Sequence, residues 1–307
     1  TYFPEKLTIQ RSQDAEDEPQ SYISWLLKGY EPVPPRKYLT DDFSDEAVSF
    51  VDRNRDWPFF LFLSYNAPHG PLEATPKYLN RFSHLPEGKR KTYAAMVSAV
   101  DDGVGRLLKK VRQHDLEEKT MIVFLSDNGG PSSKNGSSNA PLRGNKSDIW
   151  EGGFRVPFAI QWKDRLPAGL VFEHPVSALD LGATIVAHSG AEVPKNKPLD
   201  GVNLIPYLKG QKKTSPHEAI YLRKFDQNRF AVRHGNEKVV IPWKGADPLL
   251  FDLSTDISET NNLAVERPER VRKLEKLRKS WNKELIDPTF EGLMLRKLRK
   301  DLKSKKR

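Results

Sequence analysis

The sequence contains no cysteine and no long run of apolar residues. The absence of cysteine excludes disulfide bonds, thiolate metal sites and a cysteine nucleophile within these residues. No apolar stretch approaches the roughly 20 residues that a membrane-spanning helix requires, so we expect no membrane span. The residues that follow Thr1 show no charged segment ahead of an apolar one, and we therefore recognise no signal segment in the chain.

Positive charge is in excess, because 50 lysines and arginines face 41 aspartates and glutamates and give a net charge of +9. Much of this excess lies in residues 296–307, at the C-terminal end. A nucleic-acid-binding protein usually carries its basic residues as a stripe among aromatic side chains, so we expect no nucleic-acid partner. The basic tail is either a solvated segment or a contact for an anionic polymer or membrane surface, and its composition allows both.

Helical and strand periodicities alternate through the first part of the chain. Apolar residues at spacings of three and four predict amphipathic helices, and short apolar runs predict buried strands. The helices are expected at residues 41–52, 93–111 and 179–189, and the strands at residues 59–63, 121–125 and 158–162. This alternation predicts an α/β fold in which a mostly parallel sheet is sandwiched by helices.

The pattern changes after about residue 214. A helix is expected to begin near Pro268, and Gly235 with Asn236 suits a hairpin corner. Short strands are expected before this helix, at residues 219–222, 229–234, 238–243 and 249–253. We therefore predict an α/β domain at residues 1–213, a smaller C-terminal α+β domain of antiparallel strands with one packed helix at residues 214–290, and a basic tail at residues 291–307.

Polar residues follow two of the predicted strands, and in an open α/β sheet ligands bind beyond the carboxyl ends of the strands. Asp127 and Asn128 offer hard oxygen ligands, which suit Ca²⁺ or Mg²⁺ better than zinc. His69 follows the strand at residues 59–63, and Lys146 lies in a glycine-dense loop from which it could approach an anion. From the residues alone, Asp127 and Asn128 are more typical of an ordinary turn than of a metal site, and Lys146 is more typical of a solvated surface charge than of an anion contact.

Several segments together resemble the sulfatase family, in particular the arylsulfatase A type of the alkaline phosphatase superfamily. They occur in the expected order and cover the chain from about residue 39 to about residue 285. The main ones are FFLFLSYNAPH at 59–69, YAAMVSAVDDGVG at 93–105, SDNGG at 126–130 and the loop at 142–157, with shorter ones at 38–41, 199–201, 250–253 and 259–264. The resemblance implies an alkaline phosphatase-like fold, in which residues 1–213 form the C-terminal portion of the catalytic α/β domain.

The resemblance also implies roles for single residues. Asp127 and Asn128 match two metal ligands of the family, usually for Ca²⁺, with Mg²⁺ as the second choice. Lys146 matches the lysine that contacts the sulfate, and His69 matches the histidine that donates a hydrogen bond to it. A sulfate ester carries negative charge, so a hard cation, an ammonium group and an imidazole donor would stabilise the charge that develops during its hydrolysis.

The function that the resemblance implies is hydrolysis of sulfate esters, those of sulfated sugars or of aryl compounds, by a metal-assisted formylglycine mechanism. The implied partners are a sulfated small molecule or carbohydrate as the substrate, and a formylglycine-generating enzyme. The implied location is extracytoplasmic, whether periplasmic, secreted or lysosomal.

The sequence departs from the family's pattern in its nucleophile. Sulfatases carry, in an earlier part of the chain, two further aspartate ligands and a cysteine or serine that is converted to formylglycine. We recognise none of these in the sequence. We therefore expect the chain to be a fragment that lacks the amino-terminal part, and we expect it to be inactive when it is alone.

Two other functions stay open at this point. A phosphoesterase of the same superfamily would place an Asp-His pair where this chain has Asp127 and Asn128, because imidazole suits zinc better than an amide oxygen does. Asn128 therefore argues against it. A noncatalytic protein could instead hold a sulfated polymer with its basic tail, and metal content and turnover would distinguish these possibilities.

Overall fold

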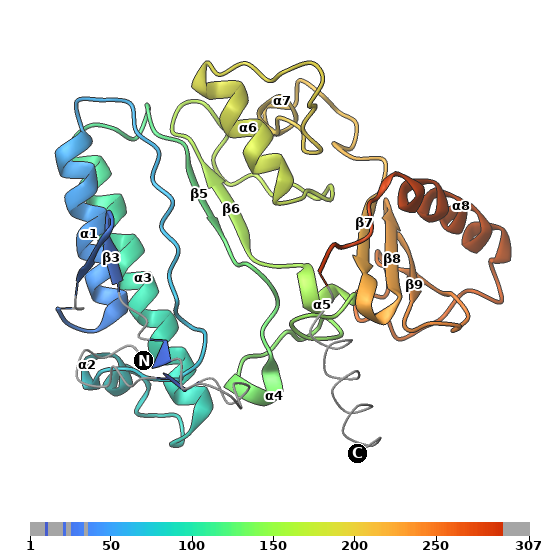
Figure 1. The fold of residues 1–307 in the computed structure, drawn as a ribbon, viewed down its shortest axis with the longest axis horizontal. Helices are drawn as coiled ribbons and strands as arrows, with labels where there is room; N and C mark the ends of the chain where they lie inside the picture. The colour runs from blue at the N-terminus through green and yellow to red at the C-terminus, as the bar shows by residue number, and fades with distance from the viewer. Residues whose placement is uncertain (1–9, 12–20, 23–25, 34–35, 291–307) are drawn as a thin grey trace. The chain divides into compact units, whose positions relative to one another are not determined.

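The computed structural model describes residues 10–11, 21–22, 26–33 and 36–290 (Figure 1). The chain forms two compact units, of which the first comprises Thr1–Met121 with Pro131–Ser138 and the second comprises Ile122–Gly130 with Asn139–Arg307. The predicted basic tail at residues 291–307 lies outside the described residues, and the predicted domain division after residue 213 stays a prediction.

The first unit is built around two long helices, α1 (Leu39–Asn54) and α3 (Lys89–Gln113), which lie side by side (Figure 1). Both helices confirm the amphipathic patterns expected at residues 41–52 and 93–111. Their apolar faces form a core with the segments around them, made of Tyr38, Leu39, Ala67, Tyr78, Ala95, Met96 and Ala99. The shorter elements of this unit are β1 (Gln10–Arg11), β2 (Ser21–Tyr22), β3 (Leu26–Lys28), β4 (Glu31–Val33), α2 (Pro76–Leu79), the 3-10 helix η2 (Asn80–Phe82) and α4 (Ser132–Asn135).

Gly103 lies within α3 at a place where other side chains come very close. A Cβ atom at this position would lie 2.2 Å from Ser44 Oγ and 2.4 Å from Tyr65 Oη. The hydroxyl groups of Ser44 and Tyr65 are themselves hydrogen-bonded at 2.8 Å. Glycine in a helix costs about 1 kcal/mol relative to alanine, and this close approach explains why the position has no side chain.

The strand predicted at residues 59–63 does not form in the structure. Phe60 and Phe62 are 66% and 77% exposed, while the residues between and beside them are half-buried. This alternation has the period of a strand, but a strand also needs a hydrogen-bonded neighbour, and none pairs with this segment in the described part of the chain. All strand pairs among the described residues are antiparallel, so the parallel pairing expected for the main sheet is not found among them.

The second unit begins with β5 (Ile122–Leu125), which pairs antiparallel with β6 (Phe158–Gln161), with Leu125 opposite Phe158. Both strands match the predicted ranges to within a residue. The helices of this part of the unit are α5 (Glu151–Phe154), α6 (Leu179–Ser189) and α7 (Ile205–Leu208). Helix α6 ends, as predicted, at Gly190, which takes the left-handed conformation with φ of 78°.

The rest of the second unit is a four-stranded antiparallel sheet in the order β10-β9-β8-β7, with the helix α8 (Pro268–Glu284) packed against it. The turn at Gly235 and Asn236 joins β8 to β9 directly, because His234 pairs with Glu237. This arrangement confirms the predicted small α+β region. Its other elements are β7 (Ile220–Lys224), the 3-10 helix η3 (Phe225–Gln227), β8 (Arg229–His234), β9 (Glu237–Ile241) and β10 (Leu249–Asp252).

The two faces of this sheet contact different parts of the chain. Because side chains alternate along a strand, Val232 and Val239 face α8 and pack with Leu274 of that helix. Ala231 and Val240 point to the other face, where they form a cluster with Ile149, Trp150, Phe251 and Leu253. The loop that contains Lys146 is therefore anchored on the face of the sheet that α8 leaves open. Within the described residues, no helix has the length and apolar character needed to cross a membrane.

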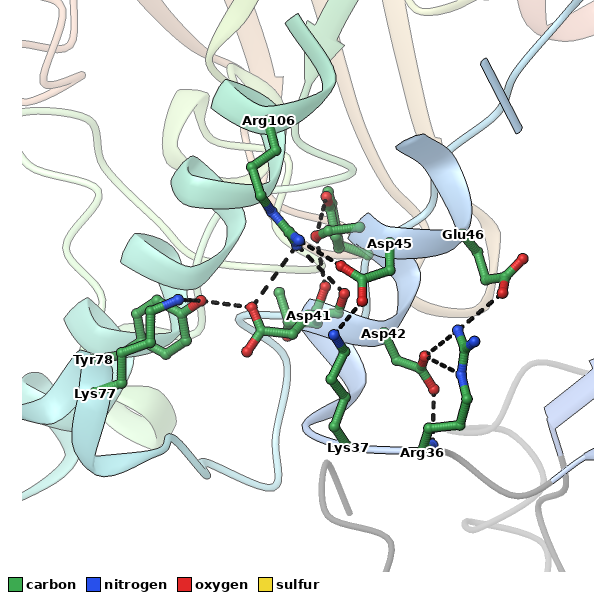
Figure 2. A network of polar contacts seen from close by, with 12 residues as sticks. Arg36, Lys37, Asp41, Asp42, Asp45, Glu46, Lys77, Tyr78 and Arg106 are labelled. Atoms are coloured by element: carbon green, nitrogen blue, oxygen red, sulfur yellow. Dashed lines mark hydrogen bonds and ion pairs between the residues drawn. The ribbon is translucent and has the colours of Figure 1, made fainter. Parts of the chain in front are cut away.

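A network of ion pairs surrounds the first turn of α1 (Figure 2). Figure 2 shows Lys37 and Arg106 both pointing toward Asp45. Burial alone would raise the pKa of Asp45, but these two hydrogen bonds outweigh it and hold the pKa below its ordinary value of 3.8. The stability that ionised Asp45 contributes is therefore present above that value and is lost as the pH falls through the lower pKa of the folded state.

We expect Asp45→Asn to lower the melting temperature of the protein near neutral pH, because Lys37 and Arg106 lose their carboxylate partner. The difference from wild type should close as the pH falls from about 6 through the lowered folded-state pKa of Asp45, below which the wild-type carboxyl is itself protonated. Thermal melts of both proteins across this range measure the effect. Asp101→Asn, on the exposed face of α3, is the matched control. A difference that stays constant with pH would contradict the assignment to Asp45.

Candidate functional site

The end of β5 places Asp127 and Asn128 beside the helix α5. The backbone N–H of Ser126 donates to the carbonyl of Pro157 at 3.2 Å, and that of Gly129 donates to the carbonyl of Gly153 at 3.0 Å. The pairing of β5 with β6 thus continues past the strand as far as α5. Asn128 and Asp127 lie between these two anchored points, so their backbone is fixed by the sheet and by α5.

Gly129 is required by this contact with α5. A Cβ atom at Gly129 would lie 1.7 Å from the carbonyl oxygen of Gly152, and backbone atoms cannot move away as a flexible side chain can. Close approach of two backbones is one of the roles that only glycine fills. Gly129 therefore allows tight packing of two backbone segments. From the sequence alone, an ordinary turn was also possible at this position.

The side-chain oxygens of Asp127 and Asn128 lack partners among the described residues, as expected for ligands of an ion. The Oδ1 atom of Asn128 is buried and accepts no hydrogen bond from the residues that the structure describes. Asp127 is exposed, and no ion pair or hydrogen bond to its carboxylate is found in the same part of the chain. A buried acceptor without a donor is uncommon and calls for an explanation such as a bound ion, so these oxygens fit a hard cation.

The described residues do not contain a complete metal site. No group of three or more histidine, aspartate or glutamate side chains among them is arranged to hold a metal ion. Ca²⁺ takes six to eight oxygen ligands and Mg²⁺ about six. Asp127 and Asn128 therefore account for only part of the ligand set that such an ion would need.

Lys146 lies in a tight turn that holds its backbone while leaving its ammonium group free. The N–H of Asp148 donates to the carbonyl of Asn145 at 2.9 Å, and the N–H of Asn145 donates to Asp148 Oδ2 at 3.1 Å. Ser147, between them, takes the left-handed conformation with φ of 71°. Lys146 is exposed, and within the described ranges its Nζ contacts no carboxylate and makes no hydrogen bond.

Arg143, another cation of this loop, is occupied by structural contacts. Its guanidinium group lies 3.7 Å from the centre of the Trp150 ring, and its Nη1 donates to the carbonyl of Glu259 at 2.8 Å. Its own carbonyl accepts from the N–H of Gly152 at 2.7 Å. Arg143 is therefore committed to the protein, whereas Lys146 can meet an anion from solvent.

A buried cluster of charges, which was not predicted from the sequence, joins α5 to the C-terminal sheet. Glu151, Lys238 and Glu259 are all fully buried. Lys238 Nζ lies 3.0 Å from Glu151 Oε1 and 2.7 Å from Glu259 Oε1, and the N–H of Glu151 donates to Glu259 Oε2 at 2.7 Å. Burial raises the pKa of Glu259 above its ordinary value of 4.5, although Lys238 acts in the opposite direction.

The sequence did contain one signal for this cluster. In the predicted strand at residues 238–243, Lys238 shares a face with Val240, which the alternation assigns to the interior. A lysine on an apolar face is almost never fully buried without a partner of opposite charge. That signal predicts a buried carboxylate opposite Lys238, though it does not identify Glu151 or Glu259.

The structure brings three of the four predicted site residues into one unit. Asp127 and Asn128 directly precede Gly129, whose N–H donates to the carbonyl of Gly153 in α5. The turn that carries Lys146 packs against the same glycine, because a Cβ atom at Gly153 would lie 2.5 Å from the carbonyl oxygen of Asp148. His69 belongs to the first unit, where its Nδ1 donates to the carbonyl of Gly70 at 2.8 Å. The convergence of His69 with the other three stays a prediction.

Comparison with protein families and curated proteins points to one group. The family model described as sulfatase matches residues 1–191, and the one described as N-sulphoglucosamine sulphohydrolase, C-terminal, matches residues 145–287. The chain is 30% identical over 294 residues to the uncharacterized sulfatase YdeN of Escherichia coli (strain K12), which covers 81% of the chain and 51% of that protein. It is 34% identical over 277 residues to the steryl-sulfatase of Mus musculus, which covers 77% of the chain and 43% of that protein. The chain thus spans about half the length of these curated relatives.

Solved structures agree with these matches. The crystal structure of Ps i-CgsB in complex with k-i-k-neocarrahexaose superposes with a TM-score of 0.86 at 36% identity, over 96% of this chain and 66% of that one. This likeness confirms the predicted fold class, an alkaline phosphatase-like α/β fold with a smaller α+β region at its C-terminal end. The sulfatase family model covers more than half of the chain, and the matched range includes Asp127 and Asn128. The chain belongs to the sulfatase family.

Proposed function

We propose that this chain is part of a sulfuric ester hydrolase, with Asp127, Asn128, Lys146 and His69 in the site that binds and cleaves a sulfate ester. The observation that carries the proposal is the buried Oδ1 of Asn128, which has no hydrogen-bond donor among the described residues. Asp127, the preceding residue, is exposed, and its carboxylate has no partner in the same part of the chain. Family membership supports the same reaction, because the relatives are sulfatases.

The proposed roles follow from charge. Asp127 and Asn128 would hold Ca²⁺, with Mg²⁺ as the second choice, and the bound cation would supply positive charge to the sulfate oxygens. Lys146 would direct its ammonium group at the sulfate, where a fixed positive charge stabilises negative charge that develops on the leaving oxygen. His69 would donate a hydrogen bond to the same group, a role that rests on its place in the family's motif.

The proposed mechanism uses a formylglycine nucleophile that these residues do not supply, because the sequence has no cysteine and no recognised serine motif. The 307-residue chain alone is then inactive, and a formylglycine-generating enzyme is the partner that modifies the nucleophile. We use the term completed enzyme for the protein that includes the nucleophile segment together with this chain. An extracytoplasmic location belongs to the same proposal and rests on the family resemblance.

A sulfated carbohydrate is the substrate class that we propose, ahead of an aryl sulfate. The match to an N-sulphoglucosamine sulphohydrolase C-terminal region over residues 145–287 supports a sulfated sugar. The likeness to Ps i-CgsB, whose crystal structure holds an oligosaccharide, supports it as well. The amide of Asn128 favours a sulfatase over a zinc phosphoesterase, because zinc prefers imidazole to an amide oxygen.

Replacing Asp127 by alanine tests the proposal, because it removes both an oxygen ligand and a negative charge from the metal site. We expect the completed enzyme to hydrolyse methylumbelliferyl sulfate and not the matching phosphate, and we expect Asp127→Ala to lose bound Ca²⁺ and activity together. Metal content by elemental analysis and steady-state rates measure the two effects.

Asp247→Ala is the matched control for Asp127→Ala, because Asp247 is also an exposed aspartate of the second unit. This control should keep both the metal and the rate. Full metal content and full activity in Asp127→Ala would show that the end of β5 is only a turn. A preference of the completed enzyme for the phosphate ester would favour the phosphoesterase instead.

A further inference from the structure

Two cations stand directly opposite each other where β7 meets β8. Lys224 and Arg229 are cross-strand partners at the end of the ladder, on the face of the sheet that also carries Ala231. Like charges directly opposite each other destabilise a strand pair, so this arrangement needs a compensating contact. Both side chains make one, and both contacts are to the turn that carries Lys146.

Arg229 and Lys224 hold two neighbouring residues of that turn. Arg229 Nη2 donates to Asp148 Oδ1 at 2.9 Å, and the side chains of this pair are 15% and 26% exposed. Lys224 Nζ donates to the carbonyl of Ser147 at 3.0 Å. The second oxygen of Asp148 accepts from the N–H of Asn145 at 3.1 Å. The carboxylate of Asp148 therefore ties the backbone of the turn to the sheet.

Lys224 contacts Ser147, and the backbone conformation of Ser147 is unfavourable by itself. A non-glycine residue in a sparsely populated conformation costs on the order of 1 to 3 kcal/mol, and it persists where the surroundings fix it. Ser147 has a φ of 71° and follows Lys146 directly. Its conformation decides the direction in which the turn presents Lys146, so the contact from Lys224 acts on the orientation of that side chain.

We infer that Arg229 and Lys224 are positioning residues, which hold the turn of residues 145–148 so that the ammonium group of Lys146 faces the sulfate. Arg229 acts through Asp148, and Lys224 acts through the carbonyl of Ser147. Neither residue touches the substrate in this arrangement, because both are engaged with the turn. The inference rests on the proposed function, since the proposed function assigns Lys146 its role in catalysis. It assigns the C-terminal sheet a part in catalysis, beyond its part in packing.

The test is steady-state kinetics of Arg229→Met in the completed enzyme. A catalytic group misplaced by about 1 Å can cost on the order of 10²-fold in rate, so we expect kcat to fall by about 10-fold to 10²-fold with little change in KM. Arg229→Lys should recover part of the rate, because it keeps the charge while losing the planar fork that reaches Asp148 and Gln227 together.

The decisive readout is the double variant Arg229→Met with Lys146→Ala. If Arg229 acts only through Lys146, the double variant should be no slower than Lys146→Ala alone, because residues that act as a unit are not additive. A purely structural role would instead lower the melting temperature and slow the Lys146→Ala enzyme further. Lys224→Met serves as the second variant and should show the same non-additivity. Arg272→Met, on the exposed face of α8, is the matched control and should keep the wild-type kcat.

The outcomes separate this inference from the proposed function. A normal kcat in Lys146→Ala would overturn the role of Lys146 and the inference with it. A lowered kcat in Lys146→Ala, combined with a normal kcat in both Arg229→Met and Lys224→Met, would overturn the inference alone. An additive loss in the double variants would overturn it as well.

Discussion

Replacing Lys146 by alanine in the completed enzyme should lower kcat by a factor on the order of 10² to 10³, the usual cost of losing one preorganised charged contact in an active site. Lys146 is exposed and unpaired among the described residues, so its charge is available to a bound anion. If the ammonium group acts on the oxygen that leaves, its effect is larger in the transition state than in the bound substrate. The loss should therefore appear in kcat more than in KM.

Lys146→Ala should hardly change the melting temperature. The turn is held by its backbone and by Asp148, and the Lys146 side chain contributes no contact to it. Steady-state kinetics and thermal melts of the same preparations measure the two quantities. Lys146→Arg should recover the rate only in part, since a planar guanidinium group cannot place its donors where a compact ammonium group was. Lys244→Ala, at another exposed lysine of the same unit, is the control. A large loss of melting temperature in Lys146→Ala would mean that the residue is structural.

Replacing Lys238 by methionine should lower the free energy of unfolding by about 3 to 5 kcal/mol, the typical cost of leaving a buried charge without its partner. Lys238 is fully buried between the carboxylates of Glu151 and Glu259. Without its ammonium group, Glu151 keeps a contact with Arg233 at 3.2 Å, while Glu259 keeps only the N–H of Glu151 on its Oε2 atom among the described contacts. Urea unfolding, followed by the midpoint concentration, measures the loss.

The pH dependence of this variant provides a second measurement. Burial already raises the pKa of Glu259, so its ionised form opposes folding once Lys238 is gone. The deficit relative to wild type should then shrink as the pH falls and Glu259 is protonated, and should grow as the pH rises through its folded-state pKa. Adding Glu259→Gln to Lys238→Met should restore part of the stability, whereas Lys244→Met should change nothing. A Lys238→Met protein as stable as wild type would contradict the buried cluster.

The parts of the fold that the sequence predicted well are those whose stability is local. The range of α6 was predicted to the residue, because an apolar face ends at a glycine that takes the left-handed conformation. The hairpin of β8 and β9 was predicted from alternation and from Gly235. The segment at residues 59–63 was predicted as a strand from its apolar run, but it forms no strand, because pairing depends on a neighbour that the run itself cannot supply.

The candidate site shows the same difference between local and long-range features. Asp127, Asn128 and Lys146 could be proposed from the sequence because they lie in motifs that are continuous in sequence. The residues that hold them were missed, because their contacts join distant segments: Arg229 and Asp148 are 81 positions apart. Lys238 was visible as a lysine on a buried strand face, yet its carboxylate partners come from elsewhere in the chain, and no spacing rule connects them.

The backbone contact at Gly129 has a consequence for attempts to change what this protein recognises. Any other amino acid at that position would push an atom into the carbonyl of Gly152, so a mutant library should leave both glycines fixed. Lys146 also cannot vary if it meets the sulfate. The exposed positions of the loop at residues 139–149 that make no contact with the sheet are left for diversification. Attempts to change the substrate specificity would therefore begin at those positions and leave the end of β5 unchanged.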